Sequence, residues 1–135
     1  MRARGREPSV PPLDYLAFEA RFRGTEETIR VRQGIYRELF AGCRRVVDLG
    51  CGRGELVQLL GEGGVEAYGV ELNEDFVDLM REKGLEVVRE DALHHLAGLA
   101  PGDVDGIVAS HVVEHLPPHV VSELVSTAWE RLHPG

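Results

Sequence analysis

Cysteine is scarce in this sequence, with Cys43 and Cys51 the only two among 135 residues. Two thiols are too few for a disulfide framework or for a zinc site with four cysteine ligands. Long apolar runs are also missing, because no stretch approaches the roughly 18 apolar residues that cross a bilayer. These absences favour a protein of the reducing cytoplasm without a membrane partner.

Positive charge is in deficit as well, since 15 Lys and Arg stand against 23 Asp and Glu and give a formal net charge of −8 at pH 7. Binding to a nucleic-acid backbone depends on basic side chains that release counterions from the phosphates. The charge balance therefore argues against a nucleic-acid partner. The first dozen residues, MRARGREPSVPP, lack the apolar core of a secretory signal, and residues 1–12 are expected to form a flexible arm.

The remaining chain has the length of one domain. Residues 13–42 are predicted to form an N-terminal helical segment that Gly42 ends. Residues 43–135 alternate between strand and helix patterns. The predicted strands are 45–49, 66–72, 85–91 and 103–110, and the predicted helices are 55–62, 73–84, 92–99 and a last one opened by Pro117-Pro118.

Strands that alternate with helices connect as βαβ crossovers and form a parallel sheet covered on both faces. We therefore predict the α/β class, as a Rossmann-like doubly wound parallel sheet with helices on both faces. In such a sheet the ligand crevice lies at the carboxyl ends of the strands. The unusual residues of this sequence fall at those ends.

The most unusual stretch is VVDLGCGRGE, residues 46–55, where three glycines alternate after the first strand. Glycine carries an entropic cost in regular structure, so something must require bare backbone there. A dinucleotide favours G-x-G-x-x-G, with its pyrophosphate at a helix N-terminus. This turn is G-x-G-x-G, and Asp48 and Glu55 flank it with negative charge that would repel a pyrophosphate. A ligand with an ammonium and a sulfonium group fits better, which favours S-adenosylmethionine.

Two further acids end the next strands. Glu71 follows the glycines by about 20 residues, where a carboxylate can accept hydrogen bonds from both ribose hydroxyls. Asp91 ends the third predicted strand, where it can accept from an adenine amino group while Ala92 leaves room for the ring. An acid at the Asp91 position can equally cap the short helix that follows it.

These motifs resemble those of the class I S-adenosylmethionine-dependent methyltransferases, over roughly residues 29–135. VVDLGCGRGE looks like their glycine motif, GVELNE like the acidic second-strand motif, REDAL like the adenine-side motif and GIVASHVVEHLPP like the fourth-strand motif. The resemblance implies a methyltransferase that passes the sulfonium methyl in line to an oxygen or nitrogen of a small-molecule or saccharide acceptor.

The resemblance also implies roles for individual residues. It brings four residues of the turn to the methionine part and the backbone of the cofactor: Asp48, Gly50, Cys51 and Gly52. It places Glu71 and Leu72 at the ribose and adenine, Asp91 and Ala92 at the adenine edge, and Ser110 and His111 beside the reactive methyl.

The upstream stretch YLAFEARFRGTEETIRVRQGIY, with its RFRG, is similar to bacterial methyltransferases found with polysaccharide and glycosyltransferase systems. This narrower similarity implies that Arg23, Arg30 or Arg32 reaches the cofactor carboxylate, and we select Arg32 as the candidate.

Histidine recurs at four-residue spacing as His111, His115 and His119. Helical histidines at this spacing can hold a metal ion, but Pro117 and Pro118 interrupt a continuous helix, so no metal site is predicted. His111 and His115 are instead the catalytic candidates, as a base for an acceptor hydroxyl, because imidazole titrates near neutrality.

Other side chains carry plainer expectations. His94 and His95 are expected to be surface residues, and Trp129 is expected to pack against the domain. Val125 falls on the predicted apolar face of the last helix.

Methyltransferases of this class continue past the HPG segment into a fifth strand and an antiparallel hairpin, which this sequence does not contain. We therefore expect either a fragment or a domain whose fourth strand is an open edge, available for a homodimer. Two other functions stay open: an NAD-dependent oxidoreductase, which the spacing of the glycines disfavours, and a catalytically silent cofactor-binding domain.

Overall fold

The computed structural model describes residues 26–109 and 112–132. The chain divides into two compact units, Met1–Ile35 and Tyr36–Gly135, and the sheet lies in the second. The predicted flexible arm and the first part of the predicted helical segment lie outside the described residues. The boundaries expected after residues 12 and 42 stay predictions.

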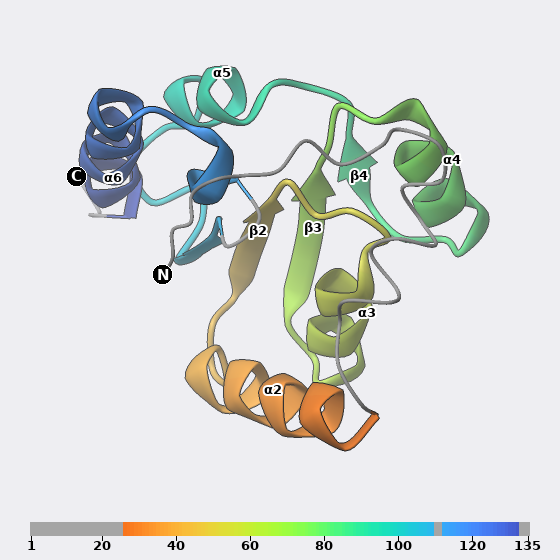
Figure 1. The fold of residues 1–135 in the computed structure, drawn as a ribbon. Helices are drawn as coiled ribbons and strands as arrows, with labels where there is room; N and C mark the ends of the chain where they lie inside the picture. Colours follow the sequence, from red (N-terminus) through yellow and green to blue (C-terminus); the bar gives the residue numbers. More distant parts are fainter. Residues whose placement is uncertain (1–25, 110–111, 133–135) are drawn as a thin grey trace. The chain divides into compact units, whose positions relative to one another are not determined.

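Strands and helices alternate along the chain (Figure 1). The strands are β2 (Arg45–Leu49), β3 (Glu66–Val70), β4 (Val87–Val88) and β5 (Gly106–Val108). The helices are α2 (Glu26–Leu39), α3 (Glu55–Glu62), α4 (Glu74–Glu82), α5 (Ala92–Ala97) and α6 (Pro118–Leu132), and η1 (Val113–His115) is a short 3-10 helix.

The four strands form one sheet in the order β4-β3-β2-β5, and every pair is parallel. The chain runs from β2 through β3 to β4 on one side, and then crosses back to place β5 on the other side of β2. The strand order therefore reverses between β2 and β5, which is the position where doubly wound sheets bind ligands. The predicted Rossmann-like class is confirmed.

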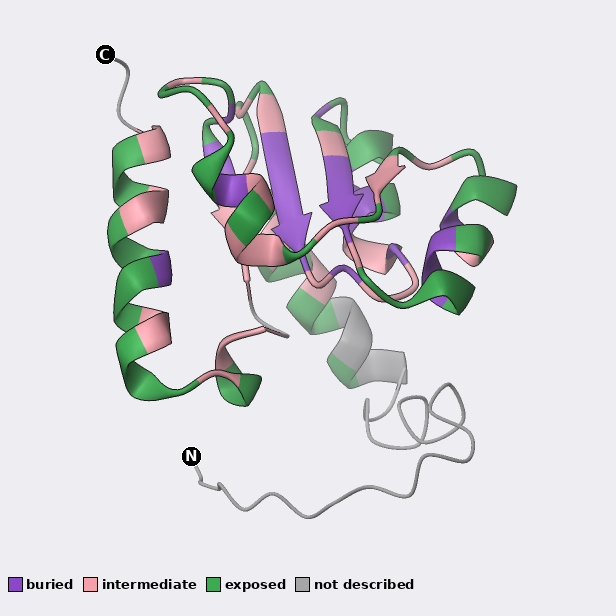
Figure 2. Cartoon of the chain, turned by 90° about the horizontal axis from the view of Figure 1, so that it is seen from above, coloured by how far each residue is buried: buried purple, intermediate pink, exposed green. Residues whose placement is uncertain are grey.

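Burial of β2 on both faces explains its apolar sequence. Successive side chains of a strand point to opposite faces. Val47 and Leu49 join a cluster with Leu96 of α5 and Leu124 of α6. Val46 packs on the opposite face, where the partners are Leu60, Val65, Val108 and, from the end of α2 and the turn after it, Tyr36 and Phe40. Figure 2 shows the consequence: the two central strands, β2 and β3, are buried toward their carboxyl ends and less buried where they begin.

Strong local signals define the helix α4. The side chain of Asn73 accepts hydrogen bonds from the amides of Asp75 and Phe76, as an N-cap does. Gly84 follows the helix with a φ of 77°, a conformation that glycine adopts without strain. The predicted helix over 73–84 is confirmed within one or two residues at each end.

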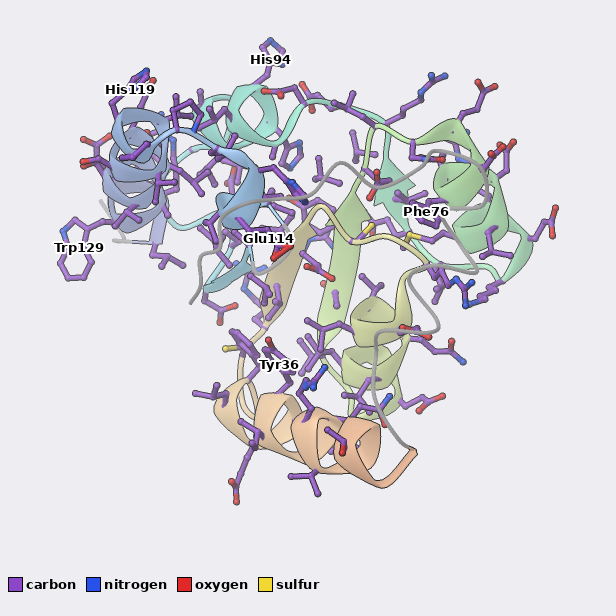
Figure 3. The ribbon with its side chains drawn as sticks, viewed as in Figure 1. Tyr36, Phe76, His94, Glu114, His119 and Trp129 are labelled. Carbon is purple, nitrogen blue, oxygen red and sulfur yellow. The ribbon has the colours of Figure 1, made fainter. Side chains whose placement is uncertain are left out.

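The structure corrects three expectations. The third strand, expected over residues 85–91, pairs in the sheet only at Val87 and Val88, where β4 forms a short strand at the edge of the sheet. Val125 and Trp129 of α6 are 60% and 65% exposed, so the apolar face of this helix is narrower than its sequence indicates. Figure 3 shows Trp129 pointing away from the domain.

Candidate functional site

The glycine turn after β2 has an unusual backbone path. Gly50, Gly52 and Gly54 have φ angles of 70°, 57° and 82°, in the left-handed region where a side chain with a Cβ atom is strained. The amides of Gly50 and Cys51 both donate to the carbonyl of Val70, at 2.8 and 3.3 Å. The alternating glycines thus let the chain turn tightly over the end of β3.

Glu71 connects three elements of this edge of the sheet. It follows β3 directly, and its Oε1 accepts a hydrogen bond from the amide of Gly52 at 2.8 Å. Its Oε2 accepts from the amide of Asn73, at the start of α4, at 2.9 Å. The carboxylate is therefore held between the glycine turn and a helix N-terminus, and both oxygens keep lone pairs for a further donor.

Asp48 is the buried acid of the site. It is 4% exposed, and its Oδ1 has no hydrogen-bond partner among the described residues. Burial, together with the negative charge of Glu71, raises the pKa of Asp48 from 3.8 to about 7. A positively charged ligand group would lower the cost of ionising Asp48 beside Glu71. The two acids, Asp48 and Glu71, therefore fit a cationic ligand and do not fit an anionic pyrophosphate.

Cys51 contributes to the site through its backbone. Its side chain is buried against Met80, with Sγ and Sδ 3.2 Å apart. Burial and the negative charges of Asp48 and Glu71 strongly raise the pKa of the thiol, which suits a packing residue and not a nucleophile. A Cβ atom on Gly69 would lie 2.2 Å from Cys51 Sγ, so Gly69 is required by this packing. A glycine inside a strand is the sequence signal for such a close approach.

The residues predicted to border the adenine follow β3 and β4 along the chain. Asp91 was expected to end its strand, but β4 ends at Val88 and Asp91 is the N-cap of α5. Leu72 is 57% exposed, so its side chain is free to contact a ring. Asp91 caps α5, because its side chain accepts from the amide of His94 at 3.0 Å. Ala92, the first residue of α5, is half-buried against the apolar cluster that includes Leu96 and Leu124. Asp91 therefore performs the capping role, and its contact with a ligand stays a prediction.

The other predicted site residues are Ser110, His111, Arg32 and His115. Ser110 and His111 lie outside the described residues. Arg32 is an exposed residue of α2 in the first unit of the chain, so its contact with the cofactor stays a prediction. His115 is exposed in η1, where its Nε2 lies 3.7 Å from Glu114 Oε1. No group of three or more metal-ligating side chains occurs in the described part of the chain.

His95 is a residue that sequence reasoning misplaced. Its Nδ1 lies 2.8 Å from Glu90 Oε1, and its Nε2 lies 2.7 Å from the hydroxyl of Tyr68. The side chain of His95 is 13% exposed, whereas that of His94 is 78% exposed and projects outward (Figure 3). The surface expectation is therefore right for His94 and wrong for His95. The polar partner on β3 could not be seen without the sheet register.

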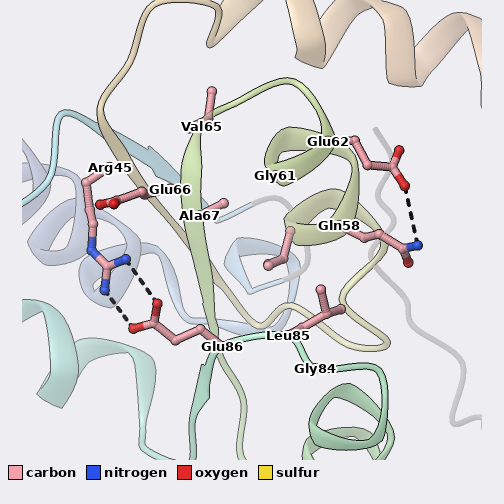
Figure 4. Close-up of a pocket in the computed structure, with 11 residues that line it drawn as sticks. Arg45, Gln58, Gly61, Glu62, Val65, Glu66, Ala67, Gly84, Leu85 and Glu86 are labelled. Carbon is pink, nitrogen blue, oxygen red and sulfur yellow. Dashed lines mark hydrogen bonds and ion pairs between the residues drawn. The ribbon is translucent and has the colours of Figure 1, made fainter.

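A groove of about 510 Å³ lies at the amino ends of the strands, among α3, the start of β3 and the segment before β4 (Figure 4). Val57 and Leu85 contribute apolar surface to it, and Arg45 forms a two-point ion pair with Glu86, at 3.1 and 2.7 Å, beside it. Because this groove lies at the amino ends of the strands, it is separate from the site at Asp48 and Glu71.

The family described as "Methionine biosynthesis protein MetW" matches residues 31–130. The chain belongs to the MetW family. A solved structure of a SAM-dependent methyltransferase from Archaeoglobus fulgidus is 42% identical, with a TM-score of 0.79, and the match covers 88% of this chain and 53% of that one.

Other relatives are more distant. The ubiquinone biosynthesis O-methyltransferase of Methylococcus capsulatus is 37% identical over 79 residues, which are 55% of this chain and 33% of that protein. A further solved structure is the 1,6-didemethyltoxoflavin-N1-methyltransferase of Burkholderia thailandensis with bound 1,6-didemethyltoxoflavin and S-adenosylhomocysteine. It is 21% identical with a TM-score of 0.63, and the match covers 95% of this chain and 62% of that one. At this identity the likeness supports the fold alone.

These comparisons confirm the resemblance to class I S-adenosylmethionine-dependent methyltransferases. The chain spans about half of the matched archaeal structure and a third of the curated relative. None of the helices in the described residues has the length and apolar character needed to cross a membrane. The cytoplasmic location stays a prediction.

Proposed function

We propose that this chain binds S-adenosylmethionine at the edge formed by Asp48, the glycine turn and Glu71, as part of a methyltransferase for a small-molecule or saccharide acceptor. The observation that carries the proposal is the pair of acids at this edge. Asp48 is buried with an unpaired oxygen, and Glu71 is fixed by the amides of Gly52 and Asn73. A cofactor with an ammonium, a sulfonium and a ribose diol matches both acids.

Each residue has a defined part in this proposal. Glu71 accepts hydrogen bonds from the ribose hydroxyls, since both of its oxygens are already oriented by backbone amides. Leu72, exposed directly beyond it, covers one face of the adenine. Asp91 and Ala92 border the adenine edge. Gly50 and Gly52 allow close approach to the methionine part, because neither carries a side chain.

The cofactor supplies a methyl group that is already activated by the positive sulfur. The chain then has to align it with the acceptor and exclude competing water, and alignment of this kind is worth several kcal/mol. His111 and His115 stay the candidate bases for an acceptor hydroxyl. The exposure of His115 would let it return a proton to solvent directly.

The acceptor class rests on the relatives. The name of the matched curated relative includes a small molecule, ubiquinone. The family description refers to methionine biosynthesis and names no methyl acceptor. The relative's name supports a small acceptor and does not discriminate between a metabolite and a saccharide. The homodimer through the edge of β5 is part of this proposal, and sedimentation equilibrium would test it.

Titration calorimetry with S-adenosylhomocysteine, and with NAD as the competing ligand, is the direct test. We expect saturable binding of S-adenosylhomocysteine and none of NAD. Glu71→Ala should weaken binding by 10-fold or more, because two hydrogen bonds to a charged acceptor are lost. Glu66→Ala is the matched control, since Glu66 is an exposed acid at the other end of the same strand.

Each outcome has a clear meaning. Loss of binding in Glu71→Ala with normal binding in Glu66→Ala supports the proposed site, provided that circular dichroism shows both variants folded. NAD binding that S-adenosylhomocysteine does not displace would favour the oxidoreductase instead. Binding without turnover on any acceptor, in a version of the protein as long as its relatives, would favour the catalytically silent cofactor-binding domain.

A further inference from the structure

Among the residues that the structure describes, Asp48 is the carboxyl side chain that is both almost fully buried and left with an unpaired oxygen. It sits at the carboxyl end of β2, between β3 and β5, and its register partners are Gly69 and Val108. Neither partner offers a side-chain hydrogen bond, since one is glycine and the other is valine. The described residues therefore bring this acid to the switch point of the sheet without a hydrogen-bond donor for its Oδ1.

The charged surroundings of Asp48 make its ionisation still less favourable. Among the described residues, the groups that interact electrostatically with its carboxyl are Glu71, from the end of β3, and the thiol of Cys51, from the turn. Neither is a cation. Glu71 cannot swing away from Asp48 without breaking its hydrogen bonds to Gly52 and Asn73. A buried acid, Asp48, and a half-buried one, Glu71, are thus held close enough to interact.

We propose that Asp48 exchanges a proton for the positive charge of the bound ligand. In the ligand-free protein the carboxyl carries a proton at and below neutral pH. When a cationic ligand lies against the glycine turn, the proton leaves to solvent and the carboxylate remains, paired with the ligand. This inference rests on the proposed function, because it takes the cationic ligand to be S-adenosylmethionine or its product.

The charge balance of the exchange is simple. A neutral carboxyl and a ligand cation give a carboxylate–cation pair and one free proton, so the buried Asp48 carboxyl carries no uncompensated charge in either state. Burial and Glu71 place the pKa of the free Asp48 carboxyl at about 7, and a nearby cation lowers it. Proton release is therefore expected at and below neutral pH, and it should vanish well above pH 8.

The affinity of the site should follow the same exchange. If only the ionised carboxyl binds the cation, the apparent binding constant equals the intrinsic constant multiplied by the ionised fraction of Asp48. With a pKa of about 7, binding at pH 6 is expected to be about 10-fold weaker than at pH 8. Adenosine, which has no amino-acid cation, should bind with no such dependence.

The experiment is calorimetry at pH 6.5 in two buffers of different ionisation enthalpy, with S-adenosylhomocysteine as the probe and adenosine as the neutral probe. The expected result is a release of about 0.8 proton with S-adenosylhomocysteine, since a group with a pKa of about 7 is protonated to that extent at pH 6.5, and of none with adenosine. Asp48→Asn removes the exchangeable proton at constant size, and its binding enthalpy should be equal in both buffers. The carbon-13 shift of the wild-type Asp48 carboxyl provides an independent reading, with a near-neutral midpoint in the free protein and an ionised group in the complex.

Different results would contradict the proton exchange at Asp48 and the proposed function. Saturable binding of S-adenosylhomocysteine with equal enthalpy in both buffers overturns the proton exchange and leaves the proposed function intact. Undiminished proton release in Asp48→Asn also overturns the assignment to Asp48. Absence of saturable binding at every pH overturns the proposed function and this inference with it.

Discussion

The hydroxyl of Tyr68 lies 2.7 Å from Nε2 of His95, which joins the middle of β3 to the helix α5. Because the carboxylate of Glu90 can only accept, His95 Nδ1 donates to it, and in the neutral imidazole Nε2 then accepts from the Tyr68 hydroxyl. The guanidinium of Arg45 lies 4.3 Å from the centre of the Tyr68 ring, within the range of a cation–π contact. This polar network fixes α5, and with it Asp91, against the sheet.

Removal of the Tyr68 hydroxyl should destabilise the domain. Tyr68→Phe leaves His95 with an unpaired ring nitrogen, and the expected loss in the free energy of unfolding is about 0.5–1.5 kcal/mol. Denaturant unfolding followed by circular dichroism measures it. His94→Ala is not a suitable control, because His94 Nδ1 contacts Glu90, which also holds His95. His119→Ala is the control instead, expected to change stability by less than about 0.5 kcal/mol because His119 is an exposed residue of α6. Equal losses in the two variants would contradict a structural role for the network.

Asp48→Asn should stabilise the ligand-free protein. The folded pKa of Asp48, about 7, lies above the ordinary value of 3.8, so the folded state holds a proton that the unfolded state has lost between these pH values. Wild-type stability therefore falls as pH rises from 4 to 7, and the penalty persists above pH 7. The full difference corresponds to about 4 kcal/mol at most, so the variant's advantage should grow over this window and then level off.

Asp105 provides the control of opposite sign. Burial alone would raise the pKa of Asp105, but the backbone amides of Arg44 and Arg45 donate to its carboxylate at 2.7 and 2.8 Å and hold the pKa below the usual value. Its contribution is present above pH 4 and is lost as pH falls through the folded pKa. Asp105→Asn should therefore be destabilising at pH 7. A stability profile for Asp48→Asn that runs parallel to wild type from pH 4 to 8 would show that Asp48 ionises normally.

The glycine turn should tolerate substitution much less well than the neighbouring helix. Gly54→Ala places a Cβ atom at a φ of 82° and 2.7 Å from Cε of Met80, which is expected to cost about 1–3 kcal/mol. Gly61→Ala, seven residues later in α3, meets no atom within 4 Å and should gain up to about 1 kcal/mol through helix propensity. Thermal unfolding of both variants measures the difference, and similar melting temperatures would be incompatible with the described turn.

Residues with strong local signals could be predicted without the fold. The cap at Asn73 and the glycine at position 84 define α4, and three glycines at alternate positions define the turn, because these features depend on backbone preferences within a few residues. Alternation of strand and helix patterns was then sufficient to establish the sheet class.

Other features depend on packing between distant segments. The shortness of β4 follows from its place at the sheet edge, and the burial of His95 follows from the position of Tyr68 on a neighbouring strand. Cys51 required Met80 and Gly69 to show that its thiol belongs to the core.

By itself, the sequence determined which residues turn, cap and line the edge of the sheet, because those preferences are local. The tertiary structure alone decided their electrostatic state. Asp48 and Glu71 lie 23 positions apart in the chain, and only parallel pairing of β2 with β3 brings their carboxyls together. Burial there removes water from Asp48, and loss of hydration is the physical reason that its charge depends on what binds beside it.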